Sequence, residues 1–475
     1  MSALSSAIAT ARSIEPRCIS GTVTAVRGAT AWVRDLPLPV GATVRVALKS
    51  RGQKSVLPST TIHNRGEVIG FNPAAGSIIM LYSSLEGIGP GTAVSGEAMA
   101  QVIGVGPEML GRVVNGLGHP IDAGPPLRDV QPRPIHSPAP DSLDRARITD
   151  VLPTGIRAID AFVPLGIGQR MGVFSAAGVG KSTLLGTIAR GADADVNVIA
   201  LIGERGREVR EFIEEALGES GLARSVVVVA TSDESPLLRV RAAHAAAAIA
   251  EFFRDRGDNV LLMMDSITRF AQAQRQIGLA IGEQPATRGY PPSVFASLPA
   301  LLERAGPLDS GGSITGLYAV LVEGDDMNEP ISDAARGILD GHITLSRRLA
   351  TQGHYPAIEV LDSISRVTER VADRHHLHSR SQLIRLMAAY REMEELINVG
   401  AYVRGSNPEC DAAIAMRNHL REYLQQGSDD AEAYPMTLRR LHELAGEAER
   451  ALASAEGAAA TAVAKARMQK GNGGA

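Results

Sequence analysis

Between Cys18 and Val94, short apolar runs alternate with turn residues at regular spacing. The runs are rich in Val, Ile, Thr and Tyr and are bounded by Gly, Pro, Asn or Asp. They lie at residues 21–26, 31–33, 43–48, 66–71 and 77–82. Short strands separated in this way are typical of a small antiparallel structure. The pattern predicts an N-terminal barrel or sandwich, which we place at residues 1–96.

Farther along, apolar runs alternate with longer helical patterns between Ile156 and Val367. The runs lie at residues 172–175, 196–202, 225–230, 260–264 and 316–322. This alternation predicts an α/β domain, at residues 97–370, with a mainly parallel sheet covered by helices on both faces. In such sheets, ligands bind at the carboxyl ends of the strands.

Two segments differ from this alternation. Residues 111–134 are rich in Gly, Pro and Asp, which predicts a loop or linker. From Val371 onward the pattern is helical, at residues 381–399, 408–425 and 435–453. We therefore expect a C-terminal helical domain at residues 371–475. Its Ala-rich segment from residue 458 ends in Lys-Gly-Asn-Gly-Gly-Ala, which predicts a frayed helix and a loose tail.

Composition narrows the class of protein. With 475 residues, of which 44% are hydrophobic and 21% charged, the chain can form two or three packed domains. Cys18 and Cys410 lie far apart, so neither a disulfide framework nor a zinc site is expected, and a reducing cytosol is the natural setting. No apolar run approaches the roughly 20 residues that span a bilayer, and residues 1–16 lack the pattern of a secretory signal.

The charge balance argues against a protein that binds nucleic acid through a strongly basic surface. The formal net charge is −4 and the sequence pI is about 6.3, so there is no global basic footprint. Nucleic acid is not an expected partner.

A glycine-rich loop follows the apolar run at residues 172–174. It reads Ser175-Ala176-Ala177-Gly178-Val179-Gly180-Lys181-Ser182 and leads into a helix-compatible segment that starts at Thr183. In a strand–loop–helix setting, the backbone N–H groups wrap a phosphate, Lys181 reaches the β- and γ-phosphates, and the Ser182 hydroxyl binds Mg²⁺. Ser175 replaces the usual first glycine, so the backbone there must tolerate a side chain. We assign nucleotide binding to Ala177, Gly178, Val179, Gly180, Lys181, Ser182 and Thr183.

Acidic residues follow two other apolar runs. Asp265 ends the run at residues 260–264, where a carboxylate can hold Mg²⁺ directly or through water. Glu204 follows the run at residues 196–202, at the same predicted sheet edge, where it can orient and deprotonate a water molecule. Each residue has a structural alternative: Asp265 as a helix cap, and Glu204 as a partner of Arg207 or Arg210.

The order of the motifs resembles the rotary ATPase superfamily and, within it, the flagellar and type III secretion export ATPases. The resemblance covers residues 20 to 445. Its motifs are Gly-Val-Gly-Lys-Ser at 178–182, Gly-Glu-Arg-Gly-Arg-Glu-Val at 203–209, Asp-Ser-Ile-Thr-Arg-Phe-Ala at 265–271 and Leu-Asp-Ser-Ile-Ser-Arg-Val at 361–367. It implies a central RecA-like P-loop nucleotide-binding domain, an N-terminal β-barrel for assembly and partner docking, and a C-terminal helical domain.

The resemblance also implies roles for individual residues. Glu204 matches the carboxylate that activates water in catalytic subunits, and Arg205 matches the catalytic arginine beside it. Arg366 matches an arginine finger that enters the neighbouring subunit's site. Tyr355 matches the aromatic that stacks on adenine, and Tyr402 is a candidate for a second aromatic from the helical domain.

From this resemblance we expect a Mg²⁺-dependent ATPase whose homohexamer energises or assists the unfolding and export of proteins through a flagellar-type (type III) secretion apparatus. Non-catalytic synthase subunits lack the glutamate at position 204, which this chain keeps. Because Glu204 and Arg366 occur in one sequence, a homohexamer can build complete sites. The implied partners are regulatory or stalk proteins, export chaperones, cargo proteins and the membrane-embedded export gate. The implied location is cytoplasmic and peripheral at the inner membrane.

Three related functions remain as alternatives. A virulence injectisome ATPase shares the chemistry, and the general look of the nucleotide domain favours the flagellar system. A synthase catalytic subunit is disfavoured by the segments at residues 283–295 and 301–306. A hexameric RNA helicase would use an aromatic-studded barrel face, whereas this barrel region holds Trp32 and few other aromatics.

Overall fold

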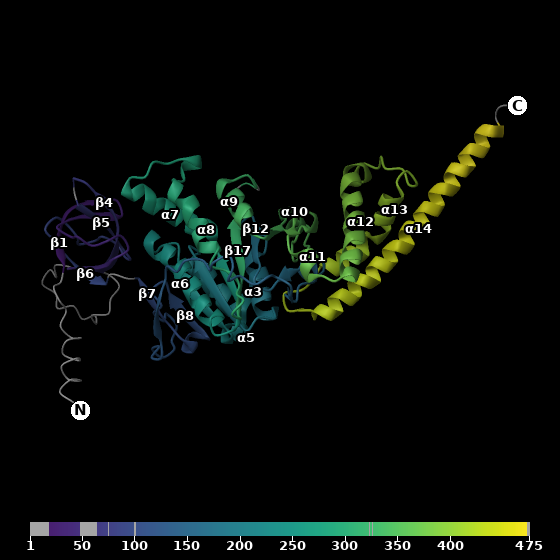
Figure 1. Ribbon diagram of the computed structural model, residues 1–475. Coiled ribbons are helices and arrows are strands. Elements are labelled where there is room, and N and C mark those ends of the chain that lie inside the picture. The colour runs from purple at the N-terminus through teal and green to yellow at the C-terminus, as the bar shows by residue number, and fades with distance from the viewer. Residues whose placement is uncertain are drawn as a thin grey trace.

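The computed structural model describes residues 19–47, 64–74, 76–98, 101–322, 324 and 326–472. Three parts follow one another in space as they do in the sequence (Figure 1). A barrel lies at one end, the nucleotide-binding part at the centre, and a group of helices at the other end. Cys18 and the segment at residues 1–16 lie outside the described residues.

The N-terminal part is a closed barrel, which decides between the barrel and the sandwich. Its strand order is β1-β2-β5-β4-β3-β6, and every neighbouring pair is antiparallel. The strands are β1 (Ser20–Arg27), β2 (Thr30–Arg34), β3 (Thr43–Val46), β4 (Arg65–Asn72), β5 (Gly76–Leu81) and β6 (Ala93–Ala98). Apolar side chains such as Val23, Val44 and Val94 are buried in its core. Sequence analysis missed β6, because Ala-Val-Ser-Gly-Glu-Ala lacks a run of β-branched residues.

The central sheet has nine strands in the order β19-β18-β12-β17-β15-β13-β14-β8, with β16 paired to β17 outside this path. All pairs are parallel except those of β16 and β19. Its strands are β8 (Arg112–Asn115), β12 (Arg170–Ser175), β13 (Val196–Ile202), β14 (Ser225–Ala230), β15 (Asn259–Asp265), β16 (Gly306–Pro307), β17 (Ser313–Leu321), β18 (Gly341–Leu345) and β19 (Ile364–Ser365). Every apolar run predicted as a strand of this sheet is one.

Helices cover both faces of the sheet. Along β13, Ile199 and Leu201 join the core that includes Leu184 of α3. Val198 and Ala200 join the opposite core, which includes Ala246 of α6. Because side chains alternate between the two faces of a strand, this division explains why every residue of β13 is buried. The helices of this part are α2 (Arg157–Phe162), α3 (Lys181–Gly191), α4 (Gly206–Glu211), α5 (Gly218–Ala223), α6 (Pro236–Arg254), α7 (Ile267–Ile281), α8 (Pro292–Leu302), α9 (Pro330–Ile338), α10 (Arg347–Thr351) and α11 (Thr368–Val371).

Short helical turns and two strand pairs complete this part of the chain. A π-helical turn spans Phe212–Leu217, and 3₁₀ turns span Pro107–Met109, Thr287–Gly289 and Val360–Asp362. Strand β7 (Val102–Val105) pairs with β9 (Gln131–Pro134), and β10 (Val151–Leu152) pairs with β11 (Leu165–Gly166).

The predicted linker at residues 111–134 is partly wrong, because it contains β8 and β9. Strand β8 pairs in parallel with β14, with Arg112 opposite Val226 and Asn115 opposite Val229. The four-residue run of β8 is too short to stand out among the surrounding Gly and Pro, and its place as the last strand of the sheet comes from tertiary pairing. The segment therefore belongs to the nucleotide-binding part.

The C-terminal part is helical as expected and consists of α12 (Arg374–Asn398), α13 (Pro408–Leu424) and α14 (Tyr434–Asn472). Helix α14 runs past the other two and projects from the molecule (Figure 1). It continues through the Ala-rich segment, so the expected loose tail is helical as far as Asn472. Residues 473–475 lie outside the described part of the chain.

A buried ion pair joins the barrel to the nucleotide-binding part. Arg241 of α6 donates from Nη1 to Oε1 of Glu67 in β4 at 3.0 Å, and both side chains are 6% exposed. Tyr82 and Gln101 also donate to this carboxylate, at 2.5 and 2.7 Å. Removing one partner of a buried pair typically costs about 3–5 kcal/mol, because the other charge stays buried alone. These contacts hold the barrel against α6.

Candidate functional site

The glycine-rich loop connects β12 to α3 and leaves backbone N–H groups free for a ligand. Gly178 and Gly180 have φ of +79° and +90°, in the left-handed region that favours glycine. No side chain caps the start of α3. The helix N-terminus therefore presents free N–H groups and a partial positive charge, which suit a phosphate. Ala177, Gly178, Ser182 and Thr183 are all exposed around this position.

Ser175 fits the loop without strain. It ends β12 with 2% of its surface exposed, and it is absent from the non-glycine residues that have positive φ in the described chain, Asp35 and Arg288. Its backbone therefore needs no glycine. Its buried Oγ has no hydrogen-bond partner among the described residues, which leaves a polar atom at the base of the phosphate loop.

Three charged side chains meet at the carboxyl edge of the sheet. Lys181 of α3 forms an ion pair with Asp265, the last residue of β15, and its Nζ lies 3.9 Å from Oε1 of Glu204. Glu204 follows β13, the strand next to β15. The sheet thus brings together the three residues that the sequence placed after separate apolar runs. Asp265 holds the buried lysine, and the next residue, Ser266, is the cap of α7.

Glu204 is electrostatically unusual. Burial and the negative charge of Asp265 raise the pKa of its carboxyl to about 7, although Lys181 opposes this shift. Its Oε1 is buried and has no hydrogen-bond partner within the described chain. The alternative partners Arg207 and Arg210 instead pair with Glu211 and Glu214. A carboxylate with a pKa near neutrality and a free oxygen atom can accept a proton from water.

The site offers Mg²⁺ two protein oxygens. Ser182 lies exposed in the first turn of α3, and Asp265 lies buried at the end of β15. No group of three or more His, Cys, Asp or Glu residues that could hold a metal occurs in the described part of the chain. Mg²⁺ usually keeps several waters and binds through one or two protein groups plus substrate phosphates. The donor set therefore fits a metal ion that arrives with a nucleotide.

A cavity of about 340 Å³ adjoins the loop. Its lining includes Gly180, Thr183, Tyr355, Gln426 and Ser428. Tyr355 is 47% exposed, and its ring lies against Gly180, where an added Cβ would meet it at 3.5 Å. A partly exposed ring beside a phosphate loop is suited to stack on a base.

Tyr402, the candidate for a second aromatic beside the base, is not among the residues that line this cavity. Its hydroxyl donates to the carbonyl oxygen of Asn407 at 3.0 Å and to Oδ1 of Asp411 at 3.1 Å. These bonds hold it in the connection between α12 and α13. The helical domain contributes Gln426, Gly427 and Ser428 instead.

Sequence analysis missed the segment at residues 426–428 because its position depends on long-range packing. Arg157 of α2 donates from Nε to the Tyr423 carbonyl at 2.6 Å, and its backbone N–H donates to the Gln426 side chain at 2.9 Å. Gln426 in turn donates its N–H to the Tyr355 carbonyl at 2.9 Å. Nothing in the local sequence signals these contacts.

The two arginines assigned to catalysis have exposed side chains. The side chain of Arg205 is 81% exposed and pairs with Glu208 at 3.4 Å. Arg366 follows β19 and is exposed, with Nη2 3.4 Å from the Arg336 carbonyl. In the register of the sheet, Ser175 lies opposite Leu345 at the carboxyl end of β18, whereas Ser365 lies opposite Gly341 at its amino end. Arg366 is therefore at the opposite edge of the sheet from the phosphate loop.

Two family models match this chain. Residues 155–365 match the nucleotide-binding domain of the ATP synthase alpha/beta family. Residues 372–443 match the C-terminal domain of the type III secretion ATPase EscN. The boundary between the two models falls between β19 and α12.

Known proteins resemble the chain over most of its length. A flagellum-specific ATP synthase of Treponema pallidum is 50% identical over 441 residues, which cover 92% of this chain and 95% of that protein. A type 3 secretion system ATPase of Xanthomonas euvesicatoria is 51% identical over 388 residues, which cover 82% and 87%. The solved structure of the assembled ATPase EscN from enteropathogenic E. coli superposes with a TM-score of 0.82 at 42% identity and covers 90% of this chain and 100% of that one.

The two tyrosines provide a test of the cavity. We expect Tyr355→Leu to weaken ATP binding by about 5- to 150-fold, because stacking of a base on an aromatic ring is worth about 1–3 kcal/mol. Tyr402→Leu is the matched control and should leave affinity unchanged, since its ring lies outside the cavity. Equilibrium titration with a fluorescent ATP analogue measures both. Equal losses in the two variants would contradict the placement of the base.

The raised pKa of Glu204 predicts a pH dependence. Below about pH 7 the carboxyl of the free enzyme is protonated and cannot accept a proton from water. We therefore expect kcat/KM for MgATP to rise as pH increases through about 7. Glu204→Gln should show low activity without this rise, which controls for titration of the substrate. If kcat/KM of the wild type stayed constant from pH 6 to pH 8, Glu204 would be excluded as the group that accepts the proton from water.

Proposed function

The chain belongs to the family of flagellum-specific and type 3 secretion ATPases, and from this premise we propose that it hydrolyses ATP as a homohexameric ring that drives protein export through a flagellar-type apparatus. The observation that carries the proposal is the convergence of Lys181, Asp265 and Glu204 at one edge of the sheet. This group combines a cation for phosphate, a carboxylate for metal and a carboxylate for water. A site that only binds nucleotide has no need of the third group.

The proposed reaction follows from these three side chains. When MgATP binds, phosphate oxygens replace Asp265 as the partner of Lys181. Ser182 and Asp265 would hold the Mg²⁺, which supplies neutralisation of charge on the β- and γ-phosphates. Glu204, whose free Oε1 faces Lys181, orients the attacking water and accepts its proton. Tyr355 holds the base beside Gly180 and so fixes the position of the phosphates.

We propose that Arg366 completes the site of the neighbouring subunit. Its exposed side chain lies at the opposite edge of the sheet from Lys181, so it is available to another protomer and distant from its own phosphate loop. The relative EscN has been solved in its assembled form, and also in complex with its central stalk EscO. By analogy, this chain forms a ring, and the ring binds a stalk protein. Arg205, largely exposed beside Glu204, is proposed to act at the same interface.

The further partners and the location are proposed on family membership. Export chaperones and cargo proteins are the expected substrates of the ring, with the barrel serving assembly and docking of regulators. None of the helices in the described residues is long and apolar enough to cross a membrane. We propose a cytoplasmic location with peripheral contact to the export gate at the inner membrane. Flagellum-specific and type 3 secretion relatives have similar identity, and we favour the flagellar system on its resemblance in the nucleotide domain.

The ring mechanism predicts complementation between inactive variants. Arg366→Ala and Glu204→Gln should each lower kcat, by about 10³–10⁵-fold for the loss of a trans-acting arginine. In mixed rings, some interfaces combine an intact Glu204 with an intact neighbouring Arg366, so activity should partly return. The measurement is steady-state phosphate release after co-assembly.

Rings of each variant alone provide the control for this experiment. A double variant, which carries Arg366→Ala and Glu204→Gln in the same chain, is assembled alone and gives the background rate of phosphate release. Mixed rings that form, as shown by mass photometry, yet stay at this background would contradict the shared site.

The export role predicts a cellular phenotype. Deleting the gene should abolish swimming and secretion of flagellar proteins in the organism that encodes it. A wild-type copy should restore both, whereas Lys181→Ala should restore neither, because its ring cannot bind the phosphates. Intact motility together with lost secretion of virulence effectors would assign the chain to an injectisome instead.

A further inference from the structure

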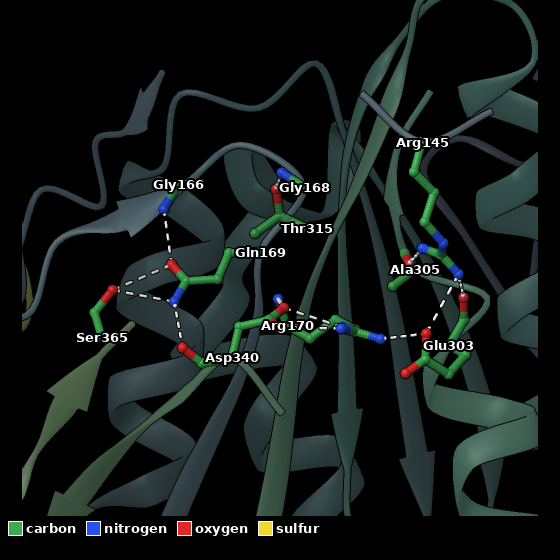
Figure 2. A network of polar contacts seen from close by, with 10 residues as sticks. All are labelled: Arg145, Gly166, Gly168, Gln169, Arg170, Glu303, Ala305, Thr315, Asp340 and Ser365. Carbon is green, nitrogen blue, oxygen red and sulfur yellow. Dashed lines mark hydrogen bonds and ion pairs between the residues drawn. The ribbon is translucent and has the colours of Figure 1, made fainter. Parts of the chain in front are cut away.

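A polar network connects the amino ends of β12, β17 and β18 with the end of β19 (Figure 2). It lies at the edge of the sheet opposite the phosphate loop. Gln169 and Arg170, at the start of β12, are its central members, and Asp340, just before β18, contacts both. None of these residues belongs to the nucleotide site, so the network needs another explanation.

Gln169 is a fully buried amide whose polar atoms are all satisfied. Its Nε2 donates to the Asp340 carbonyl and to Oγ of Ser365, each at 3.1 Å. Its Oε1 accepts from the Gly166 N–H at 2.9 Å. The exposed fraction of Gln169 is 0%. A buried side chain that satisfies several backbone groups fixes the geometry of the segments that it joins.

Arg170 fixes the other side of Asp340. Its Nε and Nη2 donate to the two carboxylate oxygens of Asp340 at 3.0 and 3.1 Å, in a bidentate pair. Its Nη1 forms an ion pair with Glu303, which Arg145 also contacts (Figure 2). A bidentate arginine pair restricts both distance and orientation. Asp340 is therefore held by its side chain as well as by its carbonyl oxygen.

These contacts converge on the backbone of Arg366. Its N–H donates to the Asp340 carbonyl at 2.9 Å, the same oxygen that accepts from Gln169. Ser365, the preceding residue, is bonded to Gln169 directly. Strand β19 has two residues and pairs only at Gly341 and His342, so few ladder bonds hold it. The network supplies much of what keeps the backbone at Arg366 in place, while its side chain stays exposed.

We propose that Gln169 is a positioning residue for Arg366: through Ser365 and the Asp340 carbonyl it sets the backbone from which Arg366 reaches the neighbouring subunit's nucleotide. This proposal rests on the trans-acting role of Arg366 proposed above. Gln169 lies just before the strand that leads to its own phosphate loop, and residues 171–174 of β12 separate Arg170 of the network from Ser175 of the loop by about 17 Å. Proximity in the sequence would suggest an effect on the same subunit's site, whereas the contacts assign the effect to the neighbour's site.

Gln169→Leu keeps the approximate volume and removes the bonds to Ser365, Asp340 and Gly166. Because displacement of a catalytic group by about 1 Å can cost about 10²-fold in rate, we expect kcat to fall by about 10- to 100-fold. The affinity for a fluorescent ATP analogue should stay within twofold of the wild type, since Lys181 and Tyr355 are untouched. Gln276→Leu, at an exposed position of α7, is the matched control and should change neither quantity.

Mixed rings then decide on which subunit Gln169 acts. Co-assembled with Glu204→Gln, Gln169→Leu should recover activity, because the Glu204→Gln subunit presents a well-placed Arg366 to a neighbour with an intact Glu204. Co-assembled with Arg366→Ala, it should recover none, since no interface then has a well-placed arginine. The opposite pattern would overturn the proposal and assign Gln169 to its own subunit's site.

Two further results separate the possible failures. If Arg366→Ala and Glu204→Gln do not complement each other, the trans-acting arginine itself is wrong and the proposal for Gln169 is lost with it. If they complement but Gln169→Leu recovers with neither or with both, only the proposal for Gln169 is overturned. Ser365→Ala, which removes one hydroxyl and keeps the buried amide, should show a smaller defect of the same class. Ser365→Ala serves as the test variant if Gln169→Leu does not assemble. Full activity of Ser365→Ala rings would contradict the proposal.

Discussion

The buried cation at the carboxyl edge of the central sheet is the feature on which the rest of the site depends. Lys181 is 10% exposed, and a charge that is so far removed from water needs a partner. Asp265 provides that partner, and the pair requires that β12 and β15 reach the same edge of one sheet. The same requirement places Glu204 next to two charges. Burial and the negative charge of Asp265 raise the pKa of the Glu204 carboxyl to about 7, although Lys181 opposes this shift.

Two arginines attach the other parts of the chain to this sheet. Arg241 joins α6 to the barrel through the buried carboxylate of Glu67. Arg157 joins α2 to the C-terminal helices through the carbonyl oxygens of Tyr423 and Gln425, at the end of α13. The second attachment matters directly for the ligand, because it brings Gln426 and its neighbours to the cavity beside Tyr355. The cavity beside Tyr355 is therefore formed jointly by the sheet domain and the helical domain.

The proposed assembly divides the chemistry between the two ends of one strand. At its carboxyl end, β12 leads into the phosphate loop, and just before its amino end Gln169 contacts Ser365, the residue before Arg366. A protomer that binds ATP at one edge thus presents its arginine from the opposite edge. Under this proposal, a single sequence contains the whole set of catalytic groups and yet depends on a neighbour to use them.

The sequence determined the parts of this structure that local pattern controls. Apolar runs at the right spacing gave the central strands, and the glycine-rich motif gave the phosphate loop, because burial of a strand on both faces and the left-handed turns at Gly178 and Gly180 are properties of short segments. The acidic residues at strand ends followed from the rule that parallel strands share a carboxyl edge.

Only the tertiary structure decided the rest. Strands β6 and β8 have weak patterns of their own and form because a neighbouring strand offers unpaired backbone groups. The contacts of Arg157 with Gln426, and of Gln169 with Ser365, join residues that are far apart in the chain. Their energies come from burial and hydrogen bonds that exist after the domains have packed, and no short stretch of sequence encodes those contacts.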